Sequence, residues 1–243
     1  LENRALDLWS ILSFANPGYL GSRTQFSARY DRSEAPPHLR SLLAARLRPI
    51  LLRRTKAEVA PELPDRIEER VDCVLSRGQR QLYLAELRRS RRLLQELARD
   101  PDELKKNRIT ILAALTRLRQ ICCHPALAGG KPALGSGKFD TLFDLLEPLL
   151  AEGHKVLVFS QFVECLKLLA SEMRERGLPH HILTGQTTRR ERAVTAFEQD
   201  PRASVFLISL KAGGTGLNLT SASYVVHFDP WWNPAVEAQA IDR

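Results

Sequence analysis

Short apolar runs alternate with amphipathic helical patterns over the second half of this 243-residue chain. The predicted strands and helices follow one another in the order 155–160, 162–176, 181–185, 189–199, 204–209 and 224–229. Nearly continuous apolar strands of this kind are buried on both sides, which is typical of a parallel sheet with helices on both faces. The pattern therefore predicts the α/β class. Right-handed crossovers then bring the loops that follow the strands to one edge of the sheet, where ligands bind.

The first half of the chain has a different texture, helical and rich in arginine. Helices are expected over 6–12, 39–52, 79–98 and 104–122, with Pro101 as a breaker between the last two. Residues 65–75 read as an extended connector, and the glycine-rich stretch 129–137 reads as a linker. We expect three parts: a helical region over 1–64, a connector with a helical protrusion over 65–137, and the parallel-sheet domain over 138–243.

The formal net charge is +8 and the sequence pI is near 9.6. Such a surplus favours polyanions, above all nucleic acid, although arginine-rich helices also simply keep a surface soluble. No apolar run reaches membrane-spanning length, and no signal peptide is recognised. Four cysteines without a CxxC pair argue against a structural zinc site and fit a reducing compartment. We expect a cytoplasmic protein that binds no structural metal.

The glycine-rich segment 211–218 directly follows a predicted strand. Successive glycines let a backbone approach an anion closely, but they also serve tight turns and helix packing. The segment has neither the dinucleotide-binding spacing nor a Walker A pattern, and the run 135–138 misses Walker A at two positions. No acidic pair follows a strand as a magnesium-holding Walker B motif would. No catalytic triad or paired-carboxylate pattern stands out, and His180, His181 and His227 read as core or strand-flanking residues.

The order of several motifs resembles the SWI/SNF-type family of superfamily-two helicases. The block Arg53-Arg54-Thr55-Lys56 resembles the family's exit from lobe one, and Leu118 to Pro125 resembles the helical region before lobe two. Residues 155–162 resemble motif IV, 206–218 resemble motif V, and Asp229-Pro230-Trp231-Trp232-Asn233-Pro234 begins a motif VI of bacterial or archaeal type. Arg66 stands where the family usually has lysine.

The resemblance implies the second, RecA-like lobe of a DNA-dependent ATPase, preceded by a helical remnant of lobe one. Such a lobe would contact duplex DNA and the arginine-finger side of the ATP cleft, with lobe one of the same polypeptide as its partner. ATP and Mg²⁺ would serve the intact protein, and none is expected tightly bound here. We expect this sequence to be a piece of a longer chain, because it begins at Leu1, has its only methionine at Met173 and ends uncapped at Arg243. Such a piece is expected to be inactive alone, and the protein is expected to be associated with the nucleoid.

The resemblance also assigns residues by position. Arg243, as the first of two arginine fingers, and Gln239 would face the γ-phosphate, and Gly216 and Asn218 would line the nucleotide side. Arg53 and Arg54 would act between the lobes. The residues expected on DNA phosphates are Ser160, Gln161, Thr184, Gly185, Ser209, Lys211, Gly213, Gly214 and Trp232. Taken singly, the hydroxyl residues also read as caps or turn residues, and the tryptophans as core.

Two other functions stay open at this stage. The lobe fold also suits a non-catalytic module that binds nucleic acid or protein, which degenerate motifs in the flanking sequence would favour. An unrelated doubly wound enzyme, such as a small-molecule transferase, would instead show a deep apolar pocket at the strand edge without a basic track. The sequence does not distinguish transcription, repair and remodelling, or translocation from unwinding, and it does not give the oligomeric state.

Overall fold

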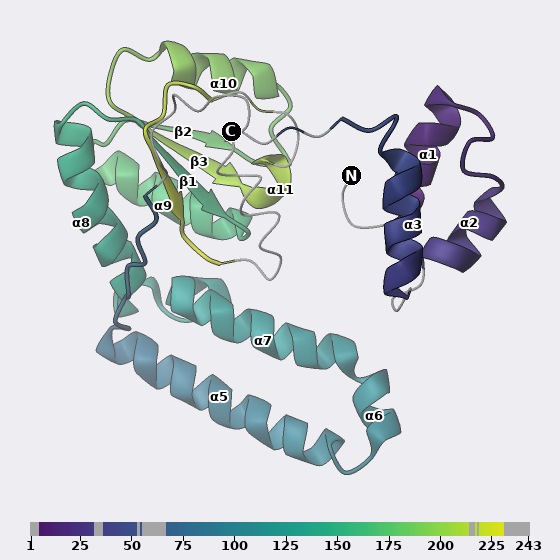
Figure 1. Cartoon of the computed structure of the whole chain (residues 1–243). Helices are drawn as coiled ribbons and strands as arrows, with labels where there is room; N and C mark the ends of the chain where they lie inside the picture. Colours follow the sequence, from purple (N-terminus) through teal and green to yellow (C-terminus); the bar gives the residue numbers. More distant parts are fainter. Residues whose placement is uncertain are drawn as a thin grey trace. The chain divides into compact units, whose positions relative to one another are not determined.

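A computed structural model describes residues 5–31, 36–52, 54, 67–213, 217 and 219–230 (Figure 1). The chain divides into two compact units, Leu1–Glu69 and Arg70–Arg243, and each is described by itself. The three-part division drawn from the sequence stays a prediction.

In the first unit, the described residues form a cluster of helices. They are α1 Ala5–Ala15, α2 Arg23–Tyr30 and α3 Pro37–Leu47. Their shared core contains Leu12, Phe26 and Leu47. Tyr19 donates its hydroxyl hydrogen bond to the carbonyl of Arg46 over 2.7 Å, which ties the turn after α1 to the end of α3. The predicted helix over 39–52 is shorter than expected, because it ends at Leu47.

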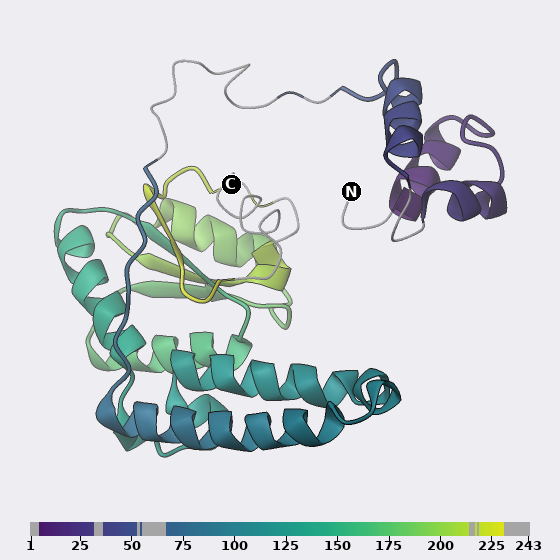
Figure 2. The ribbon, with the colours of Figure 1, turned by 60° about the horizontal axis from the view of Figure 1, so that its bottom comes forward.

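The second unit begins with extended backbone and a helical hairpin. The hairpin consists of α5 Arg77–Leu97, α6 Pro101–Lys106 and α7 Arg108–Cys123, and two views show α5 and α7 side by side (Figures 1 and 2). Pro101 was predicted as a breaker but is the first residue of α6, where its missing N–H costs no helical hydrogen bond. An ion pair of 3.1 Å between Arg117 and Glu86 joins the two long helices.

A four-stranded parallel sheet follows the hairpin. The strands are β1 Val156–Ser160, β2 His180–Leu183, β3 Val205–Ser209 and β4 Tyr224–His227, in the spatial order β2-β3-β1-β4. The helices of this part are α8 Gly137–Ala151, α9 Val163–Glu175, α10 Arg190–Gln199 and the short α11 Leu210–Gly213. The glycine-rich segment 211–218 follows β3 as predicted, and its first residues, Lys211 to Gly213, belong to α11.

Alternate strand residues build two separate cores. Val156 and Val158 of β1 pack with α8 and α9, whereas Leu157 and Phe159 pack with α10 on the opposite face. Every residue of β1 and β3 is buried. The predicted α/β class, a parallel sheet covered on both faces, is confirmed.

The buried amide of Gln79 joins the hairpin to the sheet domain. Its Nε2 donates to the carbonyls of Ile121 and Cys122 over 2.7 and 3.2 Å. Its Oε1 accepts from the N–H of Ser76 and of Gly137, over 3.2 and 3.3 Å. One side chain thus holds the start of α5, the end of α7 and the start of α8.

The stretch 129–137, predicted as a linker, is instead folded into this junction. It contains the 3₁₀ turn η2 Pro132–Leu134, which follows another, η1 Pro125–Ala128. Ser76 Oγ donates to the carbonyl of Leu134 over 2.8 Å, and Ser136 Oγ donates to that of Cys123 over 2.6 Å. These contacts cross long sequence distances, so local composition does not reveal them.

Gly137 permits the closest approach at the junction. A Cβ at this position would overlap the backbone carbonyl of Val74. We expect Gly137→Ala to lower the free energy of unfolding by about 3 kcal/mol, because backbone rather than a flexible side chain must move. Urea unfolding measures this. Gly185→Ala is the matched control, since a Cβ there meets no atom within 4 Å, and equal stability of the two variants would contradict the packing argument.

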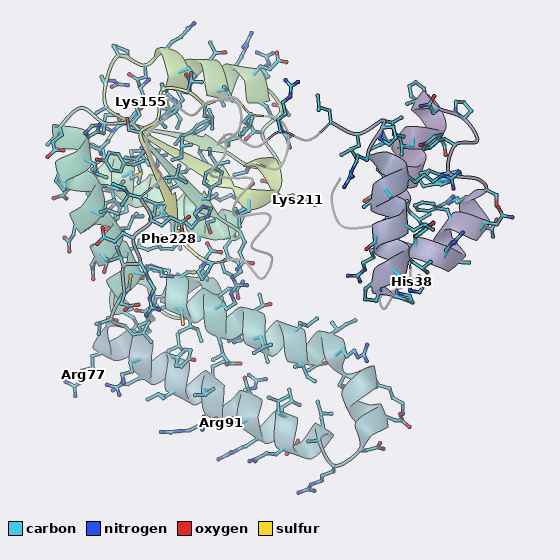
Figure 3. All side chains as sticks on the ribbon, viewed as in Figure 1. His38, Arg77, Arg91, Lys155, Lys211 and Phe228 are labelled. Carbon is cyan, nitrogen blue, oxygen red and sulfur yellow. The ribbon has the colours of Figure 1, made fainter. Side chains whose placement is uncertain are left out.

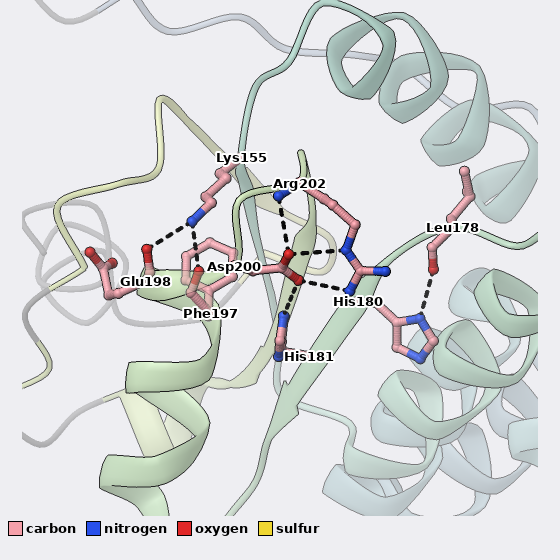
Figure 4. A network of polar contacts seen from close by, with 8 residues as sticks. All are labelled: Lys155, Leu178, His180, His181, Phe197, Glu198, Asp200 and Arg202. Atoms are coloured by element: carbon pink, nitrogen blue, oxygen red, sulfur yellow. Dashed lines mark hydrogen bonds and ion pairs between the residues drawn. The ribbon is translucent and has the colours of Figure 1, made fainter.

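A second polar network holds the amino edge of the sheet (Figure 4). The Asp200 carboxylate, 7% exposed, accepts two hydrogen bonds from the Arg202 guanidinium and lies 3.1 Å from His181 Nε2. Beside it, Lys155 Nζ donates to the carbonyls of Phe197 and Glu198 over 2.7 and 3.0 Å. The Arg202 guanidinium and backbone N–H, with a smaller contribution from His181, hold the pKa of Asp200 far below its usual value of 3.8.

A carboxyl whose pKa is depressed by folding stabilises the fold above its unfolded pKa. That contribution disappears as pH falls below 3.8 toward the folded pKa. Asp200→Asn should therefore lower the melting temperature by a few degrees at pH 7, and by progressively less below pH 3.8. Calorimetry across pH, with the exposed Asp144→Asn as control, measures this, and a pH-independent difference would contradict it.

Candidate nucleic-acid interface

Three of the turns singled out by the sequence directly follow strands β1, β2 and β3. Ser160 pairs with Ser209 across β1 and β3, and Leu183 pairs with Ile208 across β2 and β3. The carboxyl ends of these strands therefore lie along one edge, as parallel topology requires. That edge, which we call the carboxyl edge, brings together the predicted phosphate-contact residues that the structure describes: Ser160, Gln161, Thr184, Gly185, Ser209, Lys211 and Gly213.

The three hydroxyl residues at this edge shape its turns. Ser160 Oγ accepts from the N–H of Phe162 over 3.0 Å, and Thr184 Oγ1 accepts from that of Gln186 over 3.3 Å. Ser209 Oγ likewise accepts from the N–H of Ala212 over 3.3 Å. All three side chains are buried. Their direct effect is to fix the backbone of the turns, so any ligand would meet mainly backbone groups and the exposed side chains beside them.

Lys211 and Gly185 are the exposed members of the set. Lys211 lies on α11 and is labelled in Figure 3, and Gly185 leaves open space above its backbone. Gly213 is different, because a Cβ there would lie 2.9 Å from Phe159 Cε1. Packing of α11 against β1 therefore already requires glycine at this position.

A network of polar contacts that the sequence did not predict supports the carboxyl edge. The Arg119 guanidinium on α7 donates to Gln161 Oε1 over 3.3 Å and to the carbonyl of Pro230. It also lies 5.9 Å from the ring centroid of Phe162. Arg119 thereby connects the hairpin to the turn after β1 and to the segment that leaves β4.

The buried Asp229 and the half-buried Lys138 complete this network. Asp229 Oδ2 accepts from the N–H of Gln161 over 3.1 Å, and Lys138 Nζ donates to the carbonyl of Phe228 over 2.9 Å. Burial raises the pKa of the Asp229 carboxyl, against the opposing effect of Ser160, Gln161, Lys138 and Arg119. Lys138, the last residue of the near-miss phosphate-loop pattern, thus holds the end of the sheet together.

The remaining predicted site residues belong to the first unit or lie outside the described residues. Arg54 is exposed in the first unit. Outside the described residues lie Arg53, Gly214, Gly216, Asn218, Trp232, Gln239 and Arg243. In the described part of the chain, no group of three or more His, Cys, Asp or Glu side chains is arranged to hold a metal ion. Over the same residues, no helix is both long and apolar enough to cross a bilayer.

Comparison with known families decides the identity. The model of the SNF2-related domain matches residues 1–127, which is more than half of the chain. The chain belongs to the SNF2-related family. The model of the helicase conserved C-terminal domain matches residues 137–243, so the sheet and its carboxyl edge fall within that second domain.

Relatives of this SNF2-related chain include a putative ATP-dependent helicase/translocase of Bacillus subtilis, YwqA. The two are 39% identical over 265 residues, which covers 100% of this chain and 27% of that protein. The chain thus spans about a quarter of the length of this relative.

The fold resembles solved SWI2/SNF2 structures from Sulfolobus solfataricus. The ATPase core in complex with double-stranded DNA is 33% identical, with a TM-score of 0.63, and the match covers 98% of this chain and 52% of that one. The C-terminal domain of the same ATPase is 35% identical with a TM-score of 0.61, covering 72% of this chain and 76% of that one. The predicted RecA-like lobe and family resemblance are confirmed.

The contacts of Arg119 lead to a prediction about hydrogen exchange at Gln161. Arg119→Lys keeps the charge but loses the planar fork that reaches Gln161 and Pro230 together. We expect the N–H of Gln161 to exchange hydrogen about tenfold faster, while helix content is unchanged. Mass-spectrometric hydrogen exchange measures this. Arg117→Lys, two residues away on the same helix, is the control, and equal exchange at Gln161 in both variants would contradict the assignment.

Proposed function

We propose that this chain provides the C-terminal motor lobe of an ATP-dependent duplex-DNA translocase. The observation that carries the proposal is the carboxyl edge itself, where turns from three parallel strands lie together with the exposed Lys211 and Gly185. Family membership and the likeness to a DNA-bound ATPase core support it.

In this proposal the carboxyl edge follows one DNA strand through its phosphates. The exposed backbone at Gly185 lets a phosphate approach closely, and Lys211 provides a positive charge. Contacts of this kind carry no base information, so binding is sequence-independent and weakens as salt rises. The buried hydroxyls keep the turns in place and do not themselves reach the phosphates.

The nucleotide side of the proposal rests on residues outside the described structure. Gln239 and Arg243 would approach the γ-phosphate, with Gly216 and Asn218 beside them, and Arg53 and Arg54 would act between the lobes. Gly214 and Trp232 would extend the DNA contact. The sequence contains no Walker A pattern. In this proposal ATP and Mg²⁺ therefore bind in the intact protein, with lobe one taking part in holding them.

Opening and closing of a cleft between two lobes would move this lobe along duplex DNA. The lobe need not separate the strands, because it contacts phosphates and not paired bases. We place the protein on DNA inside the cell, with lobe one of the same polypeptide as its partner.

The proposal is tested on the longer protein that contains this chain. Lys211→Gln should raise the DNA concentration for half-maximal ATPase stimulation about five- to tenfold and reduce the salt slope of binding by about one. ATP turnover without DNA should not change. Lys131→Gln, at an exposed lysine in the 129–137 stretch, is the charge-matched control.

The isolated chain should hydrolyse little or no ATP, with or without duplex DNA. A coupled phosphate-release assay measures this. DNA-stimulated turnover by the isolated chain equal to that of the longer protein would contradict the lobe assignment, and absence of DNA stimulation in the longer protein would contradict the motor.

A further inference from the structure

Helix α5 carries a row of exposed arginines. Arg77, Arg80, Arg88, Arg91 and Arg92 are all exposed, and we call these five residues the arginine ridge. At 100° per residue they fall within an arc of about 120° on the helix surface. Ser90, on the opposite side of α5, is buried, whereas Arg88 and Arg92 line the groove between α5 and α7, the two helices that run side by side in Figures 1 and 2. Figure 3 labels Arg77 and Arg91 along this helix.

No acidic side chain forms an ion pair with the ridge in the described part of the chain. Of the acidic residues of α5, Glu86 is paired with Arg117, and Glu96, four residues after Arg92, forms no ion pair with it. Throughout the described part of the chain, none of the five ridge guanidinium groups takes part in a hydrogen bond or ion pair. Arginines elsewhere in the same unit, such as Arg176 and Arg202, do form ion pairs. Helix α5 therefore carries a row of exposed arginines that form no ion pair.

Local helix stability does not account for the row. Arg77 and Arg80, Arg88 and Arg91, and Arg88 and Arg92 are three or four residues apart, and like charges at these spacings weaken a helix. The capping box at Ser76 and the packing against α7 keep α5 helical in spite of this repulsion. The repulsion would be relieved by a bound polyanion.

The dimensions and chemistry of the ridge fit duplex DNA. From Arg77 to Arg92 the helix rises about 23 Å, roughly two-thirds of one turn of B-DNA. All basic residues of α5 are arginines, whose planar fork binds phosphate in a bidentate manner. Arginines at fixed positions along a helix match the regular spacing of phosphates in a duplex. A flexible acidic peptide has no such regular spacing, so it fits the ridge less well.

We propose that the arginine ridge is a second duplex-DNA-binding surface, which holds phosphates that the carboxyl edge does not contact. This inference rests on the proposed function, because it takes the ligand to be the same duplex. The hairpin would then strengthen DNA binding through phosphate contacts. This contribution would not depend on the base sequence and would weaken as the salt concentration rises.

The test compares two double variants of the full chain, each of which removes two positive charges. Arg88→Gln with Arg91→Gln alters the ridge, and Arg174→Gln with Arg192→Gln alters exposed arginines of α9 and α10. Binding to a 30-base-pair duplex is measured by fluorescence anisotropy over a range of salt concentrations. The ridge variant should bind about tenfold more weakly at 50 mM salt and reduce the salt slope by about two, whereas the control should change Kd less than twofold.

Further measurements test whether the ridge variant is folded, whether the carboxyl edge binds DNA, and whether the ligand is DNA or an acidic protein. The ridge variant should melt no lower than the unaltered chain, since it removes like-charge pairs, so weaker binding would not reflect unfolding. Lys211→Gln reports on the carboxyl edge. If it weakens binding while the ridge variant matches its control, the ridge inference is wrong and the proposed function stands. Competition by poly-glutamate as effective as by duplex DNA would also overturn the inference, in favour of an acidic protein partner.

Discussion

One buried amide determines how the second unit is put together. Gln79 has two donor hydrogens and two acceptor lone pairs, and all four are used across the ends of α5, α7 and α8. A fully satisfied polar group in a protein interior is specific, because any other arrangement leaves a costly unpaired atom. The hairpin and the sheet domain therefore share one rigid junction, and Gly137 lets the extended backbone at Val74 pass directly beside it.

Sequence patterns predicted the sheet well because strand periodicity and helix amphipathicity are local properties. The predicted strand over 204–209 differs from β3 by one residue, and the predicted helix over 189–199 differs from α10 by one residue. The junction was not predictable in the same way. Glycines at 129, 130, 135 and 137 read as a loose linker, yet two of them meet atoms of residues far away in the chain: Gly130 lies beside Leu82, and Gly137 lies beside Val74. A glycine required by a distant contact looks the same in sequence as a glycine in a flexible loop.

The carboxyl edge was likewise predictable only in part, because local sequence patterns locate its turns but not the distant contacts that support them. Parallel topology alone placed the turns at Ser160, Thr184 and Ser209 along one edge. The support behind that edge comes from Arg119 and Lys138, whose partners Pro230 and Phe228 are 111 and 90 residues away. Arg119 stood inside a recognised motif block, but spacing gave no reason to connect it with the end of the sheet. Motif resemblance locates such residues, and only the fold assigns their contacts.

The anchorage of Arg119 near the base of the hairpin has a mechanical consequence. Helix α5 has 21 residues and is about 31 Å long. A tilt of about 5° at its base would therefore move its far end by roughly 3 Å, a lever-arm amplification set by helix length. Conversely, a force applied at α6, at the far end of the hairpin, would be amplified by the same helix length at the Arg119 guanidinium that holds Pro230. Displacement of the far hairpin end is thus coupled, in part through Arg119, to the direction in which the chain leaves β4.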